Sequence, residues 1–171
     1  YLEMGRLAEA EPLFLEARDV TKAALGTAHP DYATRLNNLA NLYQVIGRFA
    51  EAEPLYLEAL EIGKATIGPA HPDYASRLNN LAALYLEMGR LAEAEPLFLE
   101  AHEIDKTTIG TAHPDYARDL NNLALLYQAL GRVAEAVPLI EEALAICMAS
   151  LGEAHPTTQT VQANRDQIVG K

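Results

Sequence analysis

The chain has 171 residues, half of them apolar, and a formal charge of −11 at pH 7. That negative charge argues against nucleic acid as a partner, because phosphate binding needs a basic face. No apolar run reaches the roughly 20 residues of a membrane-spanning helix, and the lone Cys147, which can form no internal disulfide, indicates a reducing and therefore cytoplasmic compartment.

One sequence unit returns every 42 residues along the chain. Its central part runs from Leu36 to Leu60, and closely similar segments begin at Leu78 and Leu120. The opening stretch, residues 1–17, repeats residues 85–101 letter for letter. Internal repeats of this length are typical of a solenoid, in which each unit contacts only its neighbours.

We therefore expect a single repeat array over residues 1–171. A partial repeat covers residues 1–28, three full repeats cover 29–70, 71–112 and 113–154, and a capping helix covers 155–171. Because Tyr1 falls within a repeat, the chain is expected to be a piece of a longer protein.

The first predicted helix runs from about Leu7 to Leu25 and forms the second half of the partial repeat. The sequence places no capping helix before it, so it should expose an apolar strip that includes Leu7, Leu13 and Phe14. This strip is a candidate surface for self-association through the uncapped N-terminal helix.

Each full repeat is expected to begin with a helix that starts at the His-Pro-Asp motif. In the copy from Asp31 to Ile46, the apolar residues recur at the spacing of a helix with one buried face: Tyr32, Leu36, Leu39, Ala40 and Tyr43. Pro is favoured at the first helical position and Asp in the first turn, and Gly47 supplies the left-handed conformation that ends a helix.

A second helix is expected almost at once, from about Phe49 to Ala65. Pro54 lies about one turn inside it, where it removes a backbone hydrogen bond, so the sequence predicts a local bend or a late helix start. Gly68 ends the helix. The connection within each repeat is so short that the helices must form an antiparallel pair.

The turn Gly-Arg-x-x-Glu-Ala at Gly47, with small residues at Ala52 and Ala59, resembles the tetratricopeptide repeat, a helix–turn–helix unit of 34 residues. This unit is about one turn longer in each helix. The motifs HPDYA, LNNLA, GR, AEAEPLY and LEAL are similar to the long repeat of kinesin light chains. The resemblance implies an all-α, right-handed superhelical solenoid of antiparallel helix pairs.

The last predicted helix, from Pro156 to about Val169, departs from the repeat pattern. It keeps a narrow apolar stripe at Val161 and Ile168 between polar residues such as Gln159 and Gln162. Terminal repeats need a polar outer face, so this segment is expected to cap the array.

The residues that could carry chemistry have simpler structural explanations. His29, His71, His113 and His155 occupy equivalent turns, and packed helices stand about 8–10 Å apart, so no two can share a metal whose nitrogen ligands lie at about 2.0–2.1 Å. We expect these histidines to help start helices, the abundant glutamates to be solvated, and Cys147 to be buried. The sequence predicts no enzyme, no metal and no cofactor.

Asparagine pairs give the first helices a polar stripe beside the buried one. Asn is unfavourable inside a helix, yet the pair occurs in all three full repeats, within rows spaced i, i+3, i+7 and i+10. The candidate binding residues are Thr34, Asn37, Asn38, Asn41 and Gln44 in the first full repeat, Ser76, Asn79, Asn80, Ala83 and Leu86 in the second, and Arg118, Asn121, Asn122, Leu125 and Gln128 in the third.

The resemblance implies that these stripes form the floor of a concave groove that holds a peptide, since an amide can both donate to and accept from a backbone. The alternative is that one Asn of each pair bonds to a neighbouring helix, in a ladder that sets the repeat-to-repeat register. We favour Asn37, Asn79 and Asn121 for the ligand and leave the second Asn of each pair open to both roles. The variable positions Ala83, Leu86 and Leu125 are a candidate apolar patch beside the constant row.

The sequence thus predicts a protein–protein interaction module with a protein or peptide ligand, an adaptor similar to the cargo-binding domain of kinesin light chains. Arg35, Arg77 and Arg118 would make the groove locally basic. One alternative is a sensor or scaffold array attached to a signalling ATPase of NB-ARC-like type or to another multidomain protein. A weaker alternative is a repeat that associates end to end.

Overall fold

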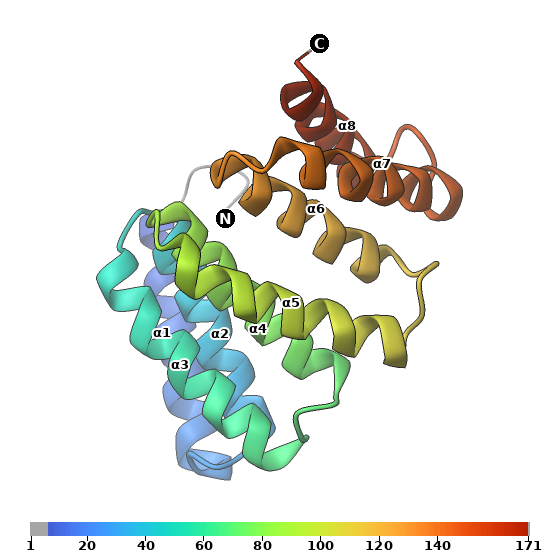
Figure 1. Cartoon of the computed structure of the whole chain (residues 1–171). Helices are drawn as coiled ribbons and strands as arrows, with labels where there is room; N and C mark the ends of the chain where they lie inside the picture. The colour runs from blue at the N-terminus through green and yellow to red at the C-terminus, as the bar shows by residue number, and fades with distance from the viewer. Residues whose placement is uncertain (1–6, 171) are drawn as a thin grey trace. The chain divides into compact units, whose positions relative to one another are not determined.

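The computed structural model describes residues 7–170, and all the regular elements within this range are α-helices (Figure 1). They are α1 (Leu7–Leu25), α2 (Pro30–Val45), α3 (Phe49–Thr66), α4 (Pro72–Glu87), α5 (Leu91–Thr108), α6 (Pro114–Ala129), α7 (Val133–Ser150) and α8 (Pro156–Val169). The chain forms two compact units, Tyr1–Leu84 and Tyr85–Lys171, called unit 1 and unit 2 below.

Histidine caps begin the first helix of the repeats. Nδ1 of His29 accepts the backbone N–H of Asp31 over 3.1 Å, and Pro30 occupies the first helical position of α2. The same bond recurs at His71, His113 and His155, with lengths of 3.1–3.2 Å. The side chain thus satisfies one of the backbone donors that a helix start leaves open, which confirms the predicted role of these histidines.

A glycine turn joins the two helices of each repeat. Gly47 has φ = 76°, its N–H donates to Gln44 over 2.9 Å, and the N–H of Arg48 donates to Tyr43 over 2.8 Å. These two bonds define the Schellman motif, whose left-handed residue is usually Gly because it carries no Cβ. Only residues 46–48 separate α2 from α3, so the two helices pack antiparallel.

The core of unit 1 lies along one face of α2. Tyr32, Ala33, Leu36 and Ala59 form a buried cluster, against which Leu55 and Ile62 of α3 pack. All five apolar positions predicted for this helix are buried. The small side chains on α3 let the two helices approach closely, since Ala52 and Ala59 are at most 1% exposed.

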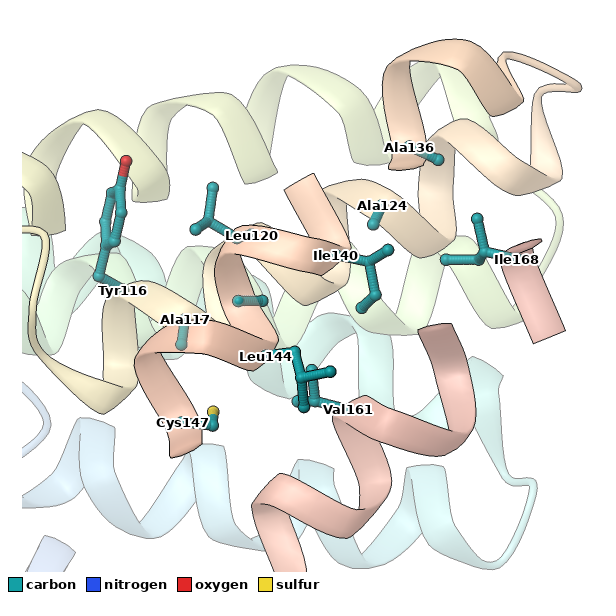
Figure 2. Packing of buried hydrophobic residues seen from close by; sticks show 11 residues of the cluster. Tyr116, Ala117, Leu120, Ala124, Ala136, Ile140, Leu144, Cys147, Val161 and Ile168 are labelled. Atoms are coloured by element: carbon teal, nitrogen blue, oxygen red, sulfur yellow. The ribbon is translucent and has the colours of Figure 1, made fainter. Parts of the chain in front are cut away.

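The core of unit 2 is built from α6, α7 and α8 (Figure 2). Val161 and Ile168 of α8 are only 3% and 6% exposed and join the residues contributed by α6 and α7. Cys147 is fully buried in this cluster, and burial raises the pKa of its thiol. The apolar stripe and the buried cysteine were therefore predicted correctly.

Pro54 does not interrupt the second helix of its repeat. Helix α3 begins at Phe49 and runs without a break through this residue, so the predicted late start is wrong. Pro54 and Ala50, whose carbonyl loses its helical donor, both lie on the exposed face, where water can reach that carbonyl.

On α1, Leu13 is 50% exposed and Phe14 is half-buried, while the side chain of Leu7 lies outside the described residues. Whether this strip mediates self-association stays a prediction. Within the part of the chain that the structure describes, no helix combines the length and apolarity needed to cross a bilayer.

Candidate functional site

The candidate binding residues lie on α2, α4 and α6 and differ in how far they reach the surface. On α2, Thr34 is exposed and the other four are half-buried. On the second and third helices, most members are half-buried, but Asn79 is only 2% exposed and Asn121 8%. Helix α2 therefore has the most accessible polar row of the three.

An asparagine ladder connects the first helices of successive repeats. Nδ2 of Asn80 donates to Oδ1 of Asn37 over 3.0 Å in unit 1, and Nδ2 of Asn164 donates to Oδ1 of Asn121 over 2.8 Å in unit 2. In both bonds the second Asn position of one repeat serves the first Asn of the repeat before it, 43 residues away. This geometry agrees with the ladder alternative for these four residues, while the assignment of Asn37, Asn79 and Asn121 to a ligand stays a prediction.

Asn164 was not predicted as a site residue, because the capping segment had lost the rest of the repeat pattern. The signal was nevertheless present, since it stands 42 residues after Asn122. Asn122 in turn accepts a bond from Nδ2 of Asn121 over 3.3 Å. The ladder therefore extends into α8, the helix that the sequence had marked only as a cap.

Tyr56 explains part of the variable row on α2. Its ring is buried in α3, and its hydroxyl lies within hydrogen-bonding distance of Asn41 Oδ1 and of Gln44 Oε1, the latter at 2.7 Å. One hydroxyl proton serves one oxygen at a time. Both predicted ligand residues are thus tied to the fold of unit 1 through one phenol.

The residue equivalent to Asn41 differs between repeats in which the residue equivalent to Tyr56 also differs. The positions equivalent to Tyr56 are Phe98 and Ile140, and those equivalent to Asn41 are Ala83 and Leu125. In unit 2, Leu125 packs against the buried cluster that contains Ile140. Packing therefore accounts for Leu125, which the sequence had offered as part of an exposed apolar patch.

A cavity of about 210 Å³ opens on unit 1, and we call it the α2–α4 cavity. It is lined by Thr34, Asn37, Asp73, Ser76, Arg77 and Asn80. Four of these were predicted as site residues, so the structure brings them together. Arg77 is 6% exposed, and burial lowers the pKa of its guanidinium despite the attraction of Asp73.

Arg118 has a different environment in unit 2. Its Nη2 lies 3.6 Å from carboxylate oxygens of both Asp105 and Asp119, and its Nη1 lies 3.3 Å from Asp115. Asp105 and Asp119 are each 1% exposed, and the pKa of Asp105 is raised by burial. Arg118, a predicted groove residue, thus forms ion pairs with three acids of its own unit.

The Gly-Arg-x-x-Glu motif is structural. The Arg48 guanidinium lies 4.3 Å above the ring of Tyr43, bonds to Glu51 and donates from Nη1 to Glu11 of α1 over 2.8 Å. Arg132 repeats the arrangement in unit 2 with Tyr127, Glu135 and Glu95. Such stacked and bidentate contacts use the planar fork of arginine, so these residues hold helices together.

Among residues 7–170, no group of three or more His, Cys, Asp or Glu side chains is placed to hold a metal ion. Four histidines act instead as caps: His29, His71, His113 and His155. The α2–α4 cavity is lined by uncharged polar side chains apart from Asp73 and Arg77.

The sequence model of the tetratricopeptide repeat family matches residues 1–65, 35–107 and 77–149. No curated protein matches this chain. A crystal structure of a candidate kinesin light chain of Podosopora anserina, with nearly identical TPR-like repeats, is 29% identical, with a TM-score of 0.78 over 99% of this chain and 82% of that one. A variant of the same protein is 28% identical, with a TM-score of 0.80 and the same coverage.

The crystal structure of BtubC (BKLC) from P. vanneervenii is 27% identical, with a TM-score of 0.82 over 99% of this chain and 67% of that one. These matches confirm the all-α, tetratricopeptide-like fold class. They also confirm the resemblance to the long, kinesin-light-chain-like repeat.

Proposed function

The chain belongs to the tetratricopeptide repeat family, and from that premise we propose that it is a protein–protein interaction module that binds a peptide segment of a partner. Repeats of this kind generally serve as scaffolds for protein interaction. The observation that carries the proposal is the α2–α4 cavity, which gathers Thr34, Asn37, Ser76 and Asn80 on neighbouring first helices.

The chemistry of this cavity suits a peptide backbone. Hydroxyl and amide side chains both donate and accept hydrogen bonds, and Thr34 is exposed at its edge while Ser76 is half-buried. The ladder bond uses only one donor of Asn80 and one acceptor of Asn37, which leaves each amide with further hydrogen-bonding capacity. A peptide that crosses the two helices would meet these groups in succession.

The similarity to a candidate kinesin light chain favours an adaptor over the other roles considered from the sequence. In that role the chain would hold a segment of a cargo or client protein, and catalysis would have no part in it. The mechanism is passive, because the peptide binds to a preformed surface. Ordering the flexible peptide costs entropy, and this cost offsets much of the affinity.

The test is selection of a displayed random-peptide library on the full chain, followed by fluorescence anisotropy with the selected peptides. Ser76→Tyr fills the α2–α4 cavity and should weaken binding by about tenfold or more, a change of about 1.4 kcal/mol. Gln159→Tyr, on the exposed face of α8, is the matched control and should bind as the parent chain does. A selection that yields no binder, or binders indifferent to Ser76→Tyr, would contradict the proposal.

A further inference from the structure

Two acidic side chains meet in the interior of unit 2, where α5 packs against α6. Asp105 comes from α5 and Asp119 from α6, and each is only 1% exposed. Their carboxyl groups are hydrogen-bonded to each other. Such a bond needs a proton on one of the two groups, because an ionised carboxylate only accepts hydrogen bonds. The geometry therefore fits a pair that shares one proton.

The charge balance around the pair also requires this proton. Nη2 of Arg118 lies 3.6 Å from Oδ2 of Asp105 and 3.6 Å from Oδ1 of Asp119, while its Nη1 lies 3.3 Å from Asp115. With one shared proton, the pair carries one negative charge, which the guanidinium balances. Without the proton it carries two, and Asp115 competes for the same guanidinium. An uncompensated buried charge is unfavourable, so loss of the proton disfavours the contact between α5 and α6.

The carboxyl pair is specific to this junction, in which the second helix of one repeat meets the first helix of the next. At the other three junctions, the equivalent positions hold Thr21 and Arg35, Gly63 and Arg77, and Cys147 and Val161. In the last of these, between α7 and α8, Cys147 and Val161 belong to the buried apolar cluster. The fold can therefore close the same junction without a carboxyl group.

Other titratable groups lie close to the pair. His102 of α5 stacks on Tyr116 of α6, with ring centroids 4.9 Å apart. Burial lowers the pKa of His102 and raises that of Tyr116, so both rings are neutral near pH 7. His102 resists protonation, so its effect on the junction runs opposite to that of the carboxyl pair. The remaining charged groups that act on these side chains are His113, Glu103, Lys106 and Glu142 of α7.

We propose that the Asp105–Asp119 pair is a pH-dependent switch, which closes the α5–α6 junction while it holds its shared proton and loosens the junction when the proton is lost. The closed pair keeps a proton that separated Asp side chains release above a pKa of about 3.9. The equilibrium constant for opening therefore rises with pH, by up to about tenfold per pH unit for one proton. It levels off once the closed pair has also lost its proton.

Hydrogen exchange of the backbone amides of α5 and α6 in the full chain tests the switch between pH 5 and pH 8. After correction for the intrinsic exchange rates, the opening constant of the parent chain should rise with pH and then level off. The double variant Asp105→Cys with Asp119→Val copies the α7–α8 junction and should show no such rise. The same pH profile in both proteins would overturn the proposal.

Three further variants separate the groups involved. Asp105→Asn keeps a hydrogen-bonding side chain that does not titrate, so it should also abolish the rise, and it keeps the test decisive if the double variant fails to fold. His102→Leu, which copies Leu60 and Leu144, should leave the rise in place. Glu58→Gln, on the exposed face of α3, is the matched control and should keep the parent profile.

The proton itself is observed by carbon-13 NMR of the aspartate side-chain carboxyl groups in the parent chain. Two interacting carboxyl groups lose their protons in two steps that belong to the pair. One step should lie above the ordinary Asp range and should coincide with the rise in amide exchange. Titration of both groups within the ordinary range would show that no proton is shared and would overturn the proposal.

Discussion

Asn164 donates a 2.8 Å hydrogen bond to Asn121. Asn80 makes the equivalent bond to Asn37 over 3.0 Å. The same exchange therefore occurs in each unit between first helices one repeat apart. The acceptors, Asn37 and Asn121, lie on the row that the sequence assigned to a ligand. Substitutions along this row therefore test whether an asparagine serves the stability of the fold or the binding of a ligand.

We expect Asn121→Ala to destabilise the chain by about 0.5–1.5 kcal/mol, the usual net contribution of one hydrogen bond, because it removes the acceptor of the half-buried Asn164 amide. Urea unfolding followed by circular dichroism measures the loss. Asn38→Ala is the control, since that half-buried side chain forms no such bond to any described residue, and it should change stability by less than about 0.5 kcal/mol. Equal losses in the two variants would argue against the ladder.

Helix capping by histidine gives a second prediction. His113→Ala removes the Nδ1 acceptor of the Asp115 N–H and should lower the stability by about 0.5–2 kcal/mol. His113→Asn should recover most of this, because Asn is a preferred N-cap residue. Thermal unfolding of the two variants supplies the comparison, and an Asn variant no better than Ala would show that capping is not the histidine's role.

Tyr56 and Asn41 should behave as a coupled pair. Tyr56→Phe removes the phenol proton and should cost about 0.5–1.5 kcal/mol. Adding Asn41→Ala reproduces the next copy, which has Phe98 and Ala83 at these positions. In a double-mutant cycle, Asn41→Ala should cost less when Tyr56→Phe is already present than it does in the parent chain. Strict additivity would mean that the hydroxyl and the amide do not interact.

The acidic pair in unit 2 gives a pH prediction. Burial raises the pKa of Asp105 even though Asp119 and Arg118 act in the opposite direction, with Asp115 and His113 also nearby. A carboxyl whose folded pKa is raised stabilises the fold at low pH, and this contribution is lost as the pH rises through the folded pKa.

Asp105→Asn should therefore stabilise the chain at neutral pH relative to its effect near pH 4, since it removes the need to bury a charge. The free energy of unfolding is measured by urea titration between these pH values. Glu100→Gln, on the exposed face of α5, is the control. The comparison between variants matters because Glu51, Glu93 and Glu135, whose pKa values are lowered by arginine hydrogen bonds, impose the opposite pH trend on the parent.

The sequence predicted the helices well because the signals that start and end a helix are local. A His-Pro start and a Gly end act within a few residues, and the buried stripe, such as Tyr32 and Leu36, follows from helical spacing alone. The face that carries the asparagines was also predicted.

The roles of the asparagines could not be predicted, because the deciding bonds join residues 43 positions apart. Local spacing does not show whether an amide faces solvent or the next helix. It also does not show that Asn79 is buried. Because it is buried, its substitution is expected to lower the stability of the fold as well as the affinity for any ligand.

The arginines show the same limit. Arg77 and Arg118 were grouped as basic groove residues, yet the chain reads Ser76-Arg77 in one copy and Arg118-Asp119 in the next. This shift by one position rotates the charge by about 100° around the helix. Arg77 is consequently buried over Gly63, while Arg118 is shared among acids.

Arg48 contacts Tyr43 at the end of α2, Glu51 in α3 and Glu11 in α1. The side chain therefore ties the turn between the two helices of one repeat to the second helix of the repeat before it. If α1 unfolds, Arg48 loses a partner and the hydroxyl of Tyr43 loses its bond to Glu11. Unfolding of unit 1 should then be cooperative across the repeat boundary, so that damage in α1 is felt in α2 and α3 and the helices melt together.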